Sequence, residues 1–338
     1  MRLFSFILTT LLALVLAGCN SRQADNMPLQ EVRLGYFPNL THAQAVLGVA
    51  SGDFSQAIAP VKLTTKVFSA GPSLIEALLV NEIDIGYVGP GPALTAFSKS
   101  EGQGIRIIAG GAANGVVVVA RNGVEISSFN DLKGKRLATP QIGNTQDISA
   151  RHYLKFVLGD QNLQYVLPIP NAEQVAMMQR GEIDAAWVPE PWGARLMAEA
   201  GGVLVGQEKD LWPDQQFTLT VVVTTPEFLA RHPDVVKKML GVHRQWTDRL
   251  SKNPQKYIPQ LEQALLSLNG KKLPPGVLGD AIGRVKFTDE PLERTLRTFA
   301  QWSYELEFFR QPLNPDGLVE ASILRQLQQS STQPVDGT

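Results

Sequence analysis

Short apolar runs alternate with helix-like segments along most of this chain, and this alternation restricts the possible folds more than any other feature. Four early runs have the pattern of strands: residues 32–36, 61–68, 83–88 and 105–109. Three segments between them have helical periodicity: residues 41–50, 73–80 and 93–98. Such repeats form a mostly parallel sheet covered by helices. Turns rich in Gly, Pro and Asn follow these strands, at the edge where open α/β sheets bind ligands.

A second series of the same kind begins after residues 116–121. Its expected strands are residues 137–139, 166–169, 183–188 and 203–205. Its expected helices are residues 145–158, 172–180 and 191–200. The β-branched run 218–225 then has the pattern of a return strand, and the chain after Pro226 is helical in pattern.

Two strand-rich segments, at about residues 112–122 and 215–225, bracket this second unit. That arrangement is typical of one domain inserted into another through two extended crossovers. We therefore expect two α/β lobes that close over a ligand by hinge bending, with lobe 1 formed by residues 31–117 and 220–325 and lobe 2 by residues 118–219. One continuous doubly wound sheet is the alternative.

The first residues differ from all the rest. Arg2 precedes a mostly apolar run, residues 3–17, that is too short to span a bilayer and suits a secretory signal. The run ends in Leu16-Ala17-Gly18-Cys19, which resembles the bacterial lipobox. We therefore expect a signal peptide over residues 1–18, lipidation of Cys19, a flexible tether over 19–30 and an extracytoplasmic, membrane-anchored protein in the cell envelope. An ordinary signal peptide with a chance cysteine is the alternative.

Composition excludes several classes of function. The 31 basic and 32 acidic residues give a net charge of -1, which provides no basic field for nucleic acid. Cys19 is the only cysteine, and the four histidines have no metal-ligand spacing, so neither a disulfide nor a metal site is expected. Because GxSxG and P-loop motifs are also absent, we expect a protein without enzymatic activity or cofactor. The polar residues 326–338 are expected to be a disordered tail.

The turns after the strands supply candidate ligand-binding residues. Residues 143–147 open a helix, so free N–H groups, the positive end of the helix dipole and short donors would meet there, which suits an oxoanion. A plain N-cap or a simple turn would have the same sequence. The candidates are Asn39, Thr41, His42, Gly71, Ser73, Gly89, Pro90, Asn114, Asn144, Thr145, Gln146 and Asp147.

Two further candidates follow a strand of the second unit. Trp192 could form an apolar wall beside a ligand, whereas Trp187 fits core packing better. Glu190 could bind a cationic or hydroxyl group, or hold the hinge. If its carboxylate faced the pocket, it would disfavour a purely anionic ligand.

Four segments resemble a known family: GYFPNLTHA (35–43), VGPGPAL (88–94), LKGKRLATPQIGNTQD (132–147) and GEIDAAWVPEPWGARL (181–196). They are similar to the periplasmic-binding proteins of sulfonate, taurine and nitrate importers, a group that includes binders of thiamine precursors. The resemblance implies the two-lobe, type II periplasmic-binding-protein fold and ABC permease subunits as partners. We also expect a small anionic ligand and a monomer.

The resemblance places an aliphatic sulfonate first among ligands, with nitrate or a related oxoanion next. A pyrimidine-type heterocycle is an alternative ligand. A lipoprotein sensor or docking module without a transport role is an alternative function. Related thiamine-pyrimidine synthases share the fold but have a cysteine cluster that this sequence lacks.

Overall fold

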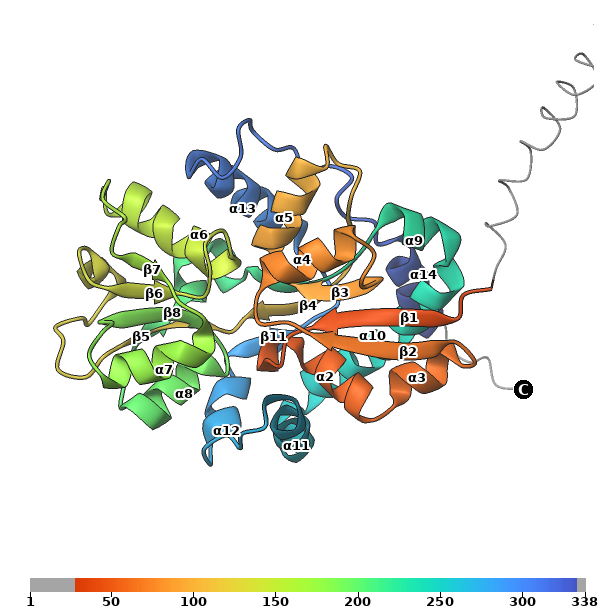
Figure 1. Cartoon of the computed structure of the whole chain (residues 1–338), viewed down its shortest axis with the longest axis horizontal. Helices are drawn as coiled ribbons and strands as arrows, with labels where there is room; N and C mark the ends of the chain where they lie inside the picture. The colour runs from red at the N-terminus through yellow and green to blue at the C-terminus, as the bar shows by residue number, and fades with distance from the viewer. Residues whose placement is uncertain (1–27, 333–338) are drawn as a thin grey trace, which may run out of the picture.

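Two β-sheets lie side by side in the computed structural model, which describes residues 28–332, and each sheet forms the centre of one lobe (Figure 1). The first sheet contains β1 (Glu31–Tyr36), β2 (Lys62–Val67), β3 (Ile85–Val88), β4 (Arg106–Asn114), β10 (Thr218–Thr224) and β11 (Val285–Phe287). The second contains β5 (Val116–Ala120), β6 (Leu137–Thr139), β7 (Val166–Pro168), β8 (Ala185–Pro189) and β9 (Val203–Gln207). The predicted two-lobe α/β fold is confirmed, and one continuous sheet is excluded.

Each sheet combines parallel strands with an antiparallel strand inserted among them, and the first sheet also has the antiparallel edge strand β11 beside β4. In the first sheet, β1 pairs in parallel with β2 and β3, and β10 runs antiparallel between β3 and β4. In the second, β6 pairs in parallel with β7 and β8, and β5 runs antiparallel between β8 and β9. The chain enters the second sheet from β4 to β5 and returns to the first through β10.

Helices cover both faces of both sheets (Figure 1). The first lobe has α2 (Ala43–Ala50), α3 (Asp53–Ile58), α4 (Gly71–Leu79), α5 (Pro90–Lys99), α9 (Pro226–Arg231), α10 (Pro233–Lys252), α11 (Ile258–Asn269) and α14 (Ser322–Thr332). The second has α6 (Thr145–His152), α7 (Asn171–Gln179) and α8 (Trp192–Ala200). The remaining helices lie at the junction of the lobes: α12 (Val277–Ile282) packs against α8, and α13 (Glu293–Glu305) packs against α5 and α6.

Local sequence patterns did not identify every element. Strand β11 lies in the segment that we expected to be helical throughout, because its short alternating sequence forms a strand only by pairing with β4. Residues 326–338 were predicted to be a disordered tail. This prediction was wrong for residues 326–332, which belong to helix α14. Leu324 of α14 is buried in the first lobe, so tertiary contacts order this polar helix. The predicted signal peptide, Cys19 and residues 333–338 lie outside the described residues.

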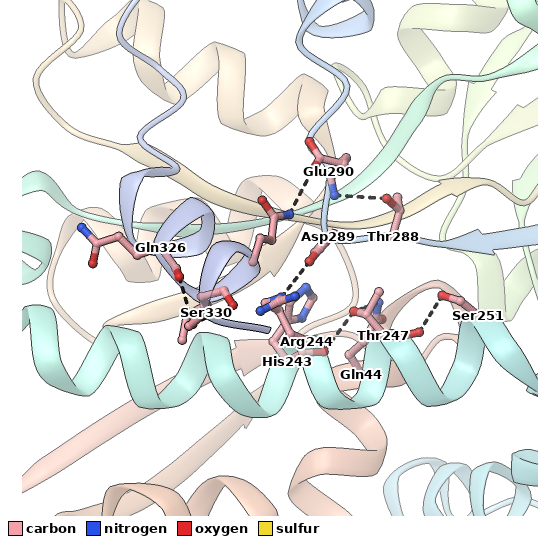
Figure 2. A network of polar contacts seen from close by, with 12 residues as sticks. Gln44, His243, Arg244, Thr247, Ser251, Thr288, Asp289, Glu290, Gln326 and Ser330 are labelled. Atoms are coloured by element: carbon pink, nitrogen blue, oxygen red, sulfur yellow. Dashed lines mark hydrogen bonds and ion pairs between the residues drawn. The ribbon is translucent and has the colours of Figure 1, made fainter. Parts of the chain in front are cut away.

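A network of polar contacts attaches the carboxyl-terminal helices to the first sheet (Figure 2). The guanidinium of Arg244 on α10 lies 3.2 Å from the carboxylate of Asp289, just after β11. On α14, the Gln328 amide donates to the Glu290 carboxylate at 3.0 Å. Gln44 of α2 donates to the Thr247 hydroxyl of α10 at 3.1 Å. These bonds lie within one lobe, so they stabilise it without involving the junction between the lobes.

Candidate functional site

A small pocket of about 30 Å³ lies where the two lobes meet. Residues from the strand ends of both sheets and from the first turns of several helices form its walls. The lining residues are Phe37, Asn39, Thr41, His42, Ser69, Gly71, Gly89, Pro92, Asn144, Thr145, Gln146, Asn171, Pro189, Leu219 and Thr220.

Three helices begin at this pocket. Helix α4 begins at Gly71, α5 follows Gly89, and α6 begins at Thr145, and all three of these residues line the pocket. The first N–H groups of a helix have no partner within the helix, and its dipole places partial positive charge at that end. Because the dipoles of three such ends meet, the pocket favours an anion without a basic side chain. Helix α5 contributes its dipole only, since Pro90 and Pro92 have no N–H group and Gly91 N–H donates to Thr145.

The pocket is uncharged. Among the described residues that line it there is no Asp, Glu, Lys or Arg. His42 is the one titratable lining residue in that set; it is buried, and desolvation lowers its pKa to about 3, so its ring is neutral at physiological pH. An anion in this pocket would therefore be stabilised by dipoles and hydrogen bonds rather than by a counter-charge.

Most of the residues predicted from the strand-end turns line this pocket together. They come from both lobes and from turns far apart in the sequence, because the carboxyl ends of neighbouring strands meet at one sheet edge. Those that the structure brings together are Asn39, Thr41, His42, Gly71, Gly89, Asn144, Thr145 and Gln146.

Glycines allow the lobes to approach closely beside the pocket. A Cβ atom at Gly89 would lie 2.4 Å from the Thr145 hydroxyl oxygen. A Cβ atom at Gly91 would lie 3.1 Å from the backbone nitrogen of Thr145 and 2.8 Å from a methyl carbon of Ile148. Gly91 N–H instead donates to Thr145 Oγ1 at 3.3 Å. The starts of α5 and α6 therefore touch because no side chain separates them.

Glu190 and Trp192 were predicted to bind ligand and are not among the residues that line this pocket. Glu190 is fully buried; its Oε1 lies 2.6 Å from Arg284 Nε, and its Oε2 accepts from Ala194 N–H at 3.0 Å. Burial raises the pKa of Glu190, and Arg284 opposes that shift. Trp192 donates from Nε1 to Asn39 Oδ1 at 2.9 Å, across the lobe junction. Both side chains join the lobes instead of facing the pocket.

Ser73 and Pro90 were also predicted as binding residues and lie outside the pocket lining. Ser73 is exposed in the first turn of α4, where its hydroxyl donates to Ala70 O at 2.9 Å. Pro90 is the buried first residue of α5 and leaves the preceding Gly89 to line the pocket.

Asp147 and Asn114, also predicted to bind ligand, lie outside the pocket lining and support its walls. Buried Asp147 accepts from the Thr139 hydroxyl at 2.8 Å and from Gly143 N–H at 3.0 Å, which fixes the loop before α6. Asn114 has φ 61° and lies at the crossover between the sheets. Its amide donates to Gln215 O and accepts from Phe217 N–H, so it ties the two crossovers together.

Three polar lining residues were missed from the sequence: Ser69, Asn171 and Thr220. Thr220 lies on the return strand β10, and Asn171 begins α7 after strand β7. Within residues 28–332, the buried atoms Thr220 Oγ1 and Asn171 Oδ1 have no hydrogen-bond partner. A buried polar atom without a partner is costly, so these two atoms mark places for ligand or water. Asn171 could have been predicted, because it follows strand β7 as the other candidates follow their strands. Nothing in the local sequence distinguishes Thr220 from other threonines in strands.

Metal-binding clusters and membrane-spanning helices are two further features to consider among the described residues. No group of three or more His, Cys, Asp and Glu side chains in residues 28–332 is placed to hold a metal ion. In the same part of the chain, we find no helix with the length and apolar character needed to cross a membrane.

Comparison with known proteins places the chain in a family. A family model described as NMT1-like matches residues 25–258. A protein of Brucella abortus named as a binding protein is 27% identical over 240 residues, which are 70% of this chain and 70% of that protein. The taurine-binding periplasmic protein of Escherichia coli is 30% identical over 171 residues, 50% of this chain and 52% of that one.

Solved structures share the fold. The alkanesulfonate-binding protein SsuA from Xanthomonas axonopodis, bound to MOPS, has a TM-score of 0.70 at 20% identity, covering 87% of this chain and 99% of that one. The nitrate-binding protein NrtA from Synechocystis has a TM-score of 0.73 at 15% identity, covering 91% and 90%. The resemblance noted in the sequence is therefore confirmed, and the chain belongs to the NMT1-like family, with the two-lobe fold of type II periplasmic-binding proteins.

Proposed function

We propose that this chain is the lipid-anchored, extracytoplasmic solute-binding subunit of an ABC importer, and that it captures a small anion, with an aliphatic sulfonate as the first candidate. The convergence of three helix N-termini on an uncharged pocket between the lobes carries this proposal. The names of the taurine-binding relative and of the alkanesulfonate-binding structure support the choice of ligand.

Capture would work by closure of the lobes. Three contacts beside the pocket need both lobes in place: Gly91 with Thr145, Asn39 with Trp192, and Glu190 with Arg284. A ligand that accepts hydrogen bonds from both lobes would add to these contacts only in the closed form, so it would shift the population toward closure. The closed protein would then present one surface from each lobe to the permease.

The anchor rests on the amino-terminal sequence. The proposal is that Cys19 carries the lipid and that the residues after it tether the first lobe to the membrane. Metabolic labelling with a fatty acid should mark the wild-type chain and should fail to mark Cys19→Ser. Equal labelling of both chains would contradict the anchor and leave the binding function untouched.

Ligand-induced stabilisation tests the binding function. The full chain, purified in a neutral detergent, would be heated with alkanesulfonates, sulfate, nitrate, phosphonates and pyrimidines. A ligand in large excess over its dissociation constant should stabilise the protein by about 3 to 4 kcal/mol. Thr145→Ala should remove most of this shift, because it deletes a hydroxyl at the pocket. The half-buried Thr298 on α13, away from the pocket, provides the matched control, Thr298→Ala. A panel without any anion that stabilises the wild type contradicts the proposal.

Transport is distinguished from sensing in the cell that makes the protein. If the chain serves an importer, its deletion should abolish uptake of the labelled ligand at low concentration. Unchanged uptake would favour a sensor instead.

A further inference from the structure

A buried carboxylate in the second lobe holds helix α6 away from the pocket end of that helix. Glu208 directly follows strand β9 and is 1% exposed. Its Oε1 accepts from the Ser149 hydroxyl at 2.6 Å and from Trp212 Nε1–H at 3.1 Å. Its Oε2 accepts from Trp187 Nε1–H at 2.6 Å. Three uncharged donors thus satisfy this carboxylate, which takes no part in the pocket lining.

The three donors come from three separate parts of the chain. Ser149 lies about one turn after Thr145, which begins α6 and lines the pocket. Trp187 lies on β8, whose last residue, Pro189, also lines the pocket. Trp212 belongs to the return crossover, the segment that leads from β9 to β10. Glu208 therefore ties a helix and a strand of the pocket wall to the return crossover.

The ring of Trp212 extends this connection toward the first lobe. It stacks on Phe217 with 5.2 Å between the ring centroids and packs against Trp302 of α13 at 4.6 Å. Phe217 N–H donates to Asn114 Oδ1, which lies at the crossover from β4 to β5. Helix α13 packs against α5, which also begins at the pocket (Figure 1). Trp212 therefore joins the Glu208 carboxylate to both of the crossovers that connect the lobes.

Helix α6 has to be placed accurately. Its first residue, Thr145, accepts from Gly91 N–H of the other lobe at 3.3 Å. This bond is already long, and the strength of a hydrogen bond falls steeply with distance and angle. A small movement of α6 would therefore lose the contact between the lobes and displace the wall that Thr145 forms.

Protonation of Glu208 would reverse one of its bonds without detaching α6. Burial raises the pKa of Glu208 to about 7, and its three hydrogen bonds oppose that rise. An indole N–H cannot accept, so Ser149 Oγ is the acceptor for a carboxyl proton among the three partners. The Ser149 hydroxyl can then donate to the Thr145 carbonyl, one turn back in the helix. The attachment of α6 therefore persists on both sides of this pKa.

From these contacts we infer that Glu208 is a positioning residue of the binding site. It fixes α6 to the return crossover, so that the pocket wall at Thr145 and the crossover move as one body when the lobes close. Glu208 acts through Ser149 and Trp212 and does not touch a ligand. The expected effect on affinity rests on the proposed function, whereas the attachment of α6 is measured without a ligand.

Ser149→Ala tests the attachment, because it removes the hydroxyl that joins α6 to Glu208 and leaves the pocket lining intact. Hydrogen exchange of the full chain in a neutral detergent should be about fivefold faster at the amides of residues 145–152. Ser303→Ala is the matched control, because this buried serine donates to Phe299 O of its own helix at 2.7 Å. Unchanged exchange in Ser149→Ala, or an equal increase in Ser303→Ala, overturns the inference.

Ligand affinity tests the consequence, with ethanesulfonate and nitrate as probes in isothermal titration calorimetry. Ser149→Ala and Trp212→Phe should each weaken binding by about fivefold, because each removes one bond to Glu208. Trp246→Phe is the matched control for the second variant: its indole also donates to a carboxylate, Asp53 Oδ2 at 2.9 Å, but within the first lobe. Both tryptophan variants should lose stability, so a loss of affinity confined to Trp212→Phe identifies positioning.

Unchanged affinity in Ser149→Ala and Trp212→Phe, or an equal loss of affinity in Trp246→Phe, overturns the positioning role and leaves anion capture standing. If the wild type binds neither probe nor any other anion, the proposed function is wrong. The exchange measurement then still decides whether Glu208 holds α6.

Discussion

The pocket and the Glu190–Arg284 contact both lie at the junction of the lobes, and they treat polar groups in opposite ways. The pocket has no charged side chain among its described residues, and two of its buried polar atoms lack a partner. Glu190 is fully buried, yet both of its carboxylate oxygens are bonded within the protein, one to Arg284 and one to Ala194 N–H. Glu190 and Arg284 therefore join the lobes without lining the pocket, whereas Asn39 and Thr145 line the pocket and also contact the other lobe.

This difference indicates how the two parts should respond to change. A buried charged group that is paired within the protein stabilises the closed form. Its removal leaves its partner buried and unpaired, which should lower the free energy of unfolding substantially. A group left without a partner contributes little to the protein alone, and its removal should affect only the ligand. The predictions below test this separation.

The largest effect is expected at the ion pair. Arg284→Met leaves the buried Glu190 carboxylate without its cation and should lower the free energy of unfolding by about 3 kcal/mol. Denaturant unfolding of the ligand-free protein measures this loss. The control is Arg297→Met, which removes an exposed ion pair with Asp316 and should cost about 1 kcal/mol or less. Equal losses in the two variants would show that the buried pair has no special role.

A smaller effect is expected where the lobes touch. Gly91→Ala places a methyl group within 2.8 Å of Ile148 and 3.1 Å of Thr145 in the opposite lobe, so it should hinder closure. Ligand affinity should fall about tenfold, which is about 1.4 kcal/mol. The stability of the ligand-free protein should not fall, because alanine favours a helix over glycine. Gly241→Ala on α10, with nothing within 4 Å of its Cβ, provides the control; the same loss of affinity there would contradict the role of close approach.

Removal of an unpartnered hydroxyl should separate binding from stability. Thr220→Val deletes the hydroxyl at the pocket and should weaken ligand binding by about fivefold without lowering the free energy of unfolding. Thr224→Val, on the same strand, deletes a hydroxyl that donates to Asp84 O at 2.7 Å. That variant should lose about 1 kcal/mol of stability and keep its affinity. Calorimetry measures the ligand affinity of both variants, and denaturant unfolding measures their stability. A loss of stability in Thr220→Val would mean that its hydroxyl has a partner in the protein.

The smallest effect is expected from pH. Burial lowers the pKa of His42 to about 3, so the folded pocket does not titrate between about pH 5 and pH 8 and sulfonate affinity should stay constant. In the unfolded chain His42 takes up its proton near its ordinary value of 6.5, so its contribution to stability falls on acidification below that value. Affinity that rises on acidification around pH 6 would show that His42 becomes charged in the pocket and would contradict its neutrality.

Much of the site could be predicted because its signals are local. A Gly-Pro or Asn-Thr pair after an apolar run marks the start of a helix, and parallel strands bring such starts to one edge. This reasoning found Asn39, Gly71 and Thr145. The same reasoning predicted Glu190 and Trp192 as ligand contacts, because both follow a strand. The sequence does not show that these side chains bond to other groups of the protein.

Other features depended on contacts between distant segments. Strand β11 exists through its pairing with β4, and α14 is ordered by packing on the first lobe. The lack of a partner for Thr220 Oγ1 is a property of everything around it, so no pattern in the strand sequence could reveal it. Asn114 similarly shows its role only where the two crossovers lie together.

The sequence by itself determined two α/β units, their connection by two crossovers and the helix starts that meet between them, because strand period, helix period and turn residues act over short distances. The tertiary structure alone decided which polar groups are satisfied within the protein and which are left for a ligand. A hydrogen bond requires two groups at the correct distance and angle, and here the partners are often a hundred or more residues apart, as in Asn39 with Trp192.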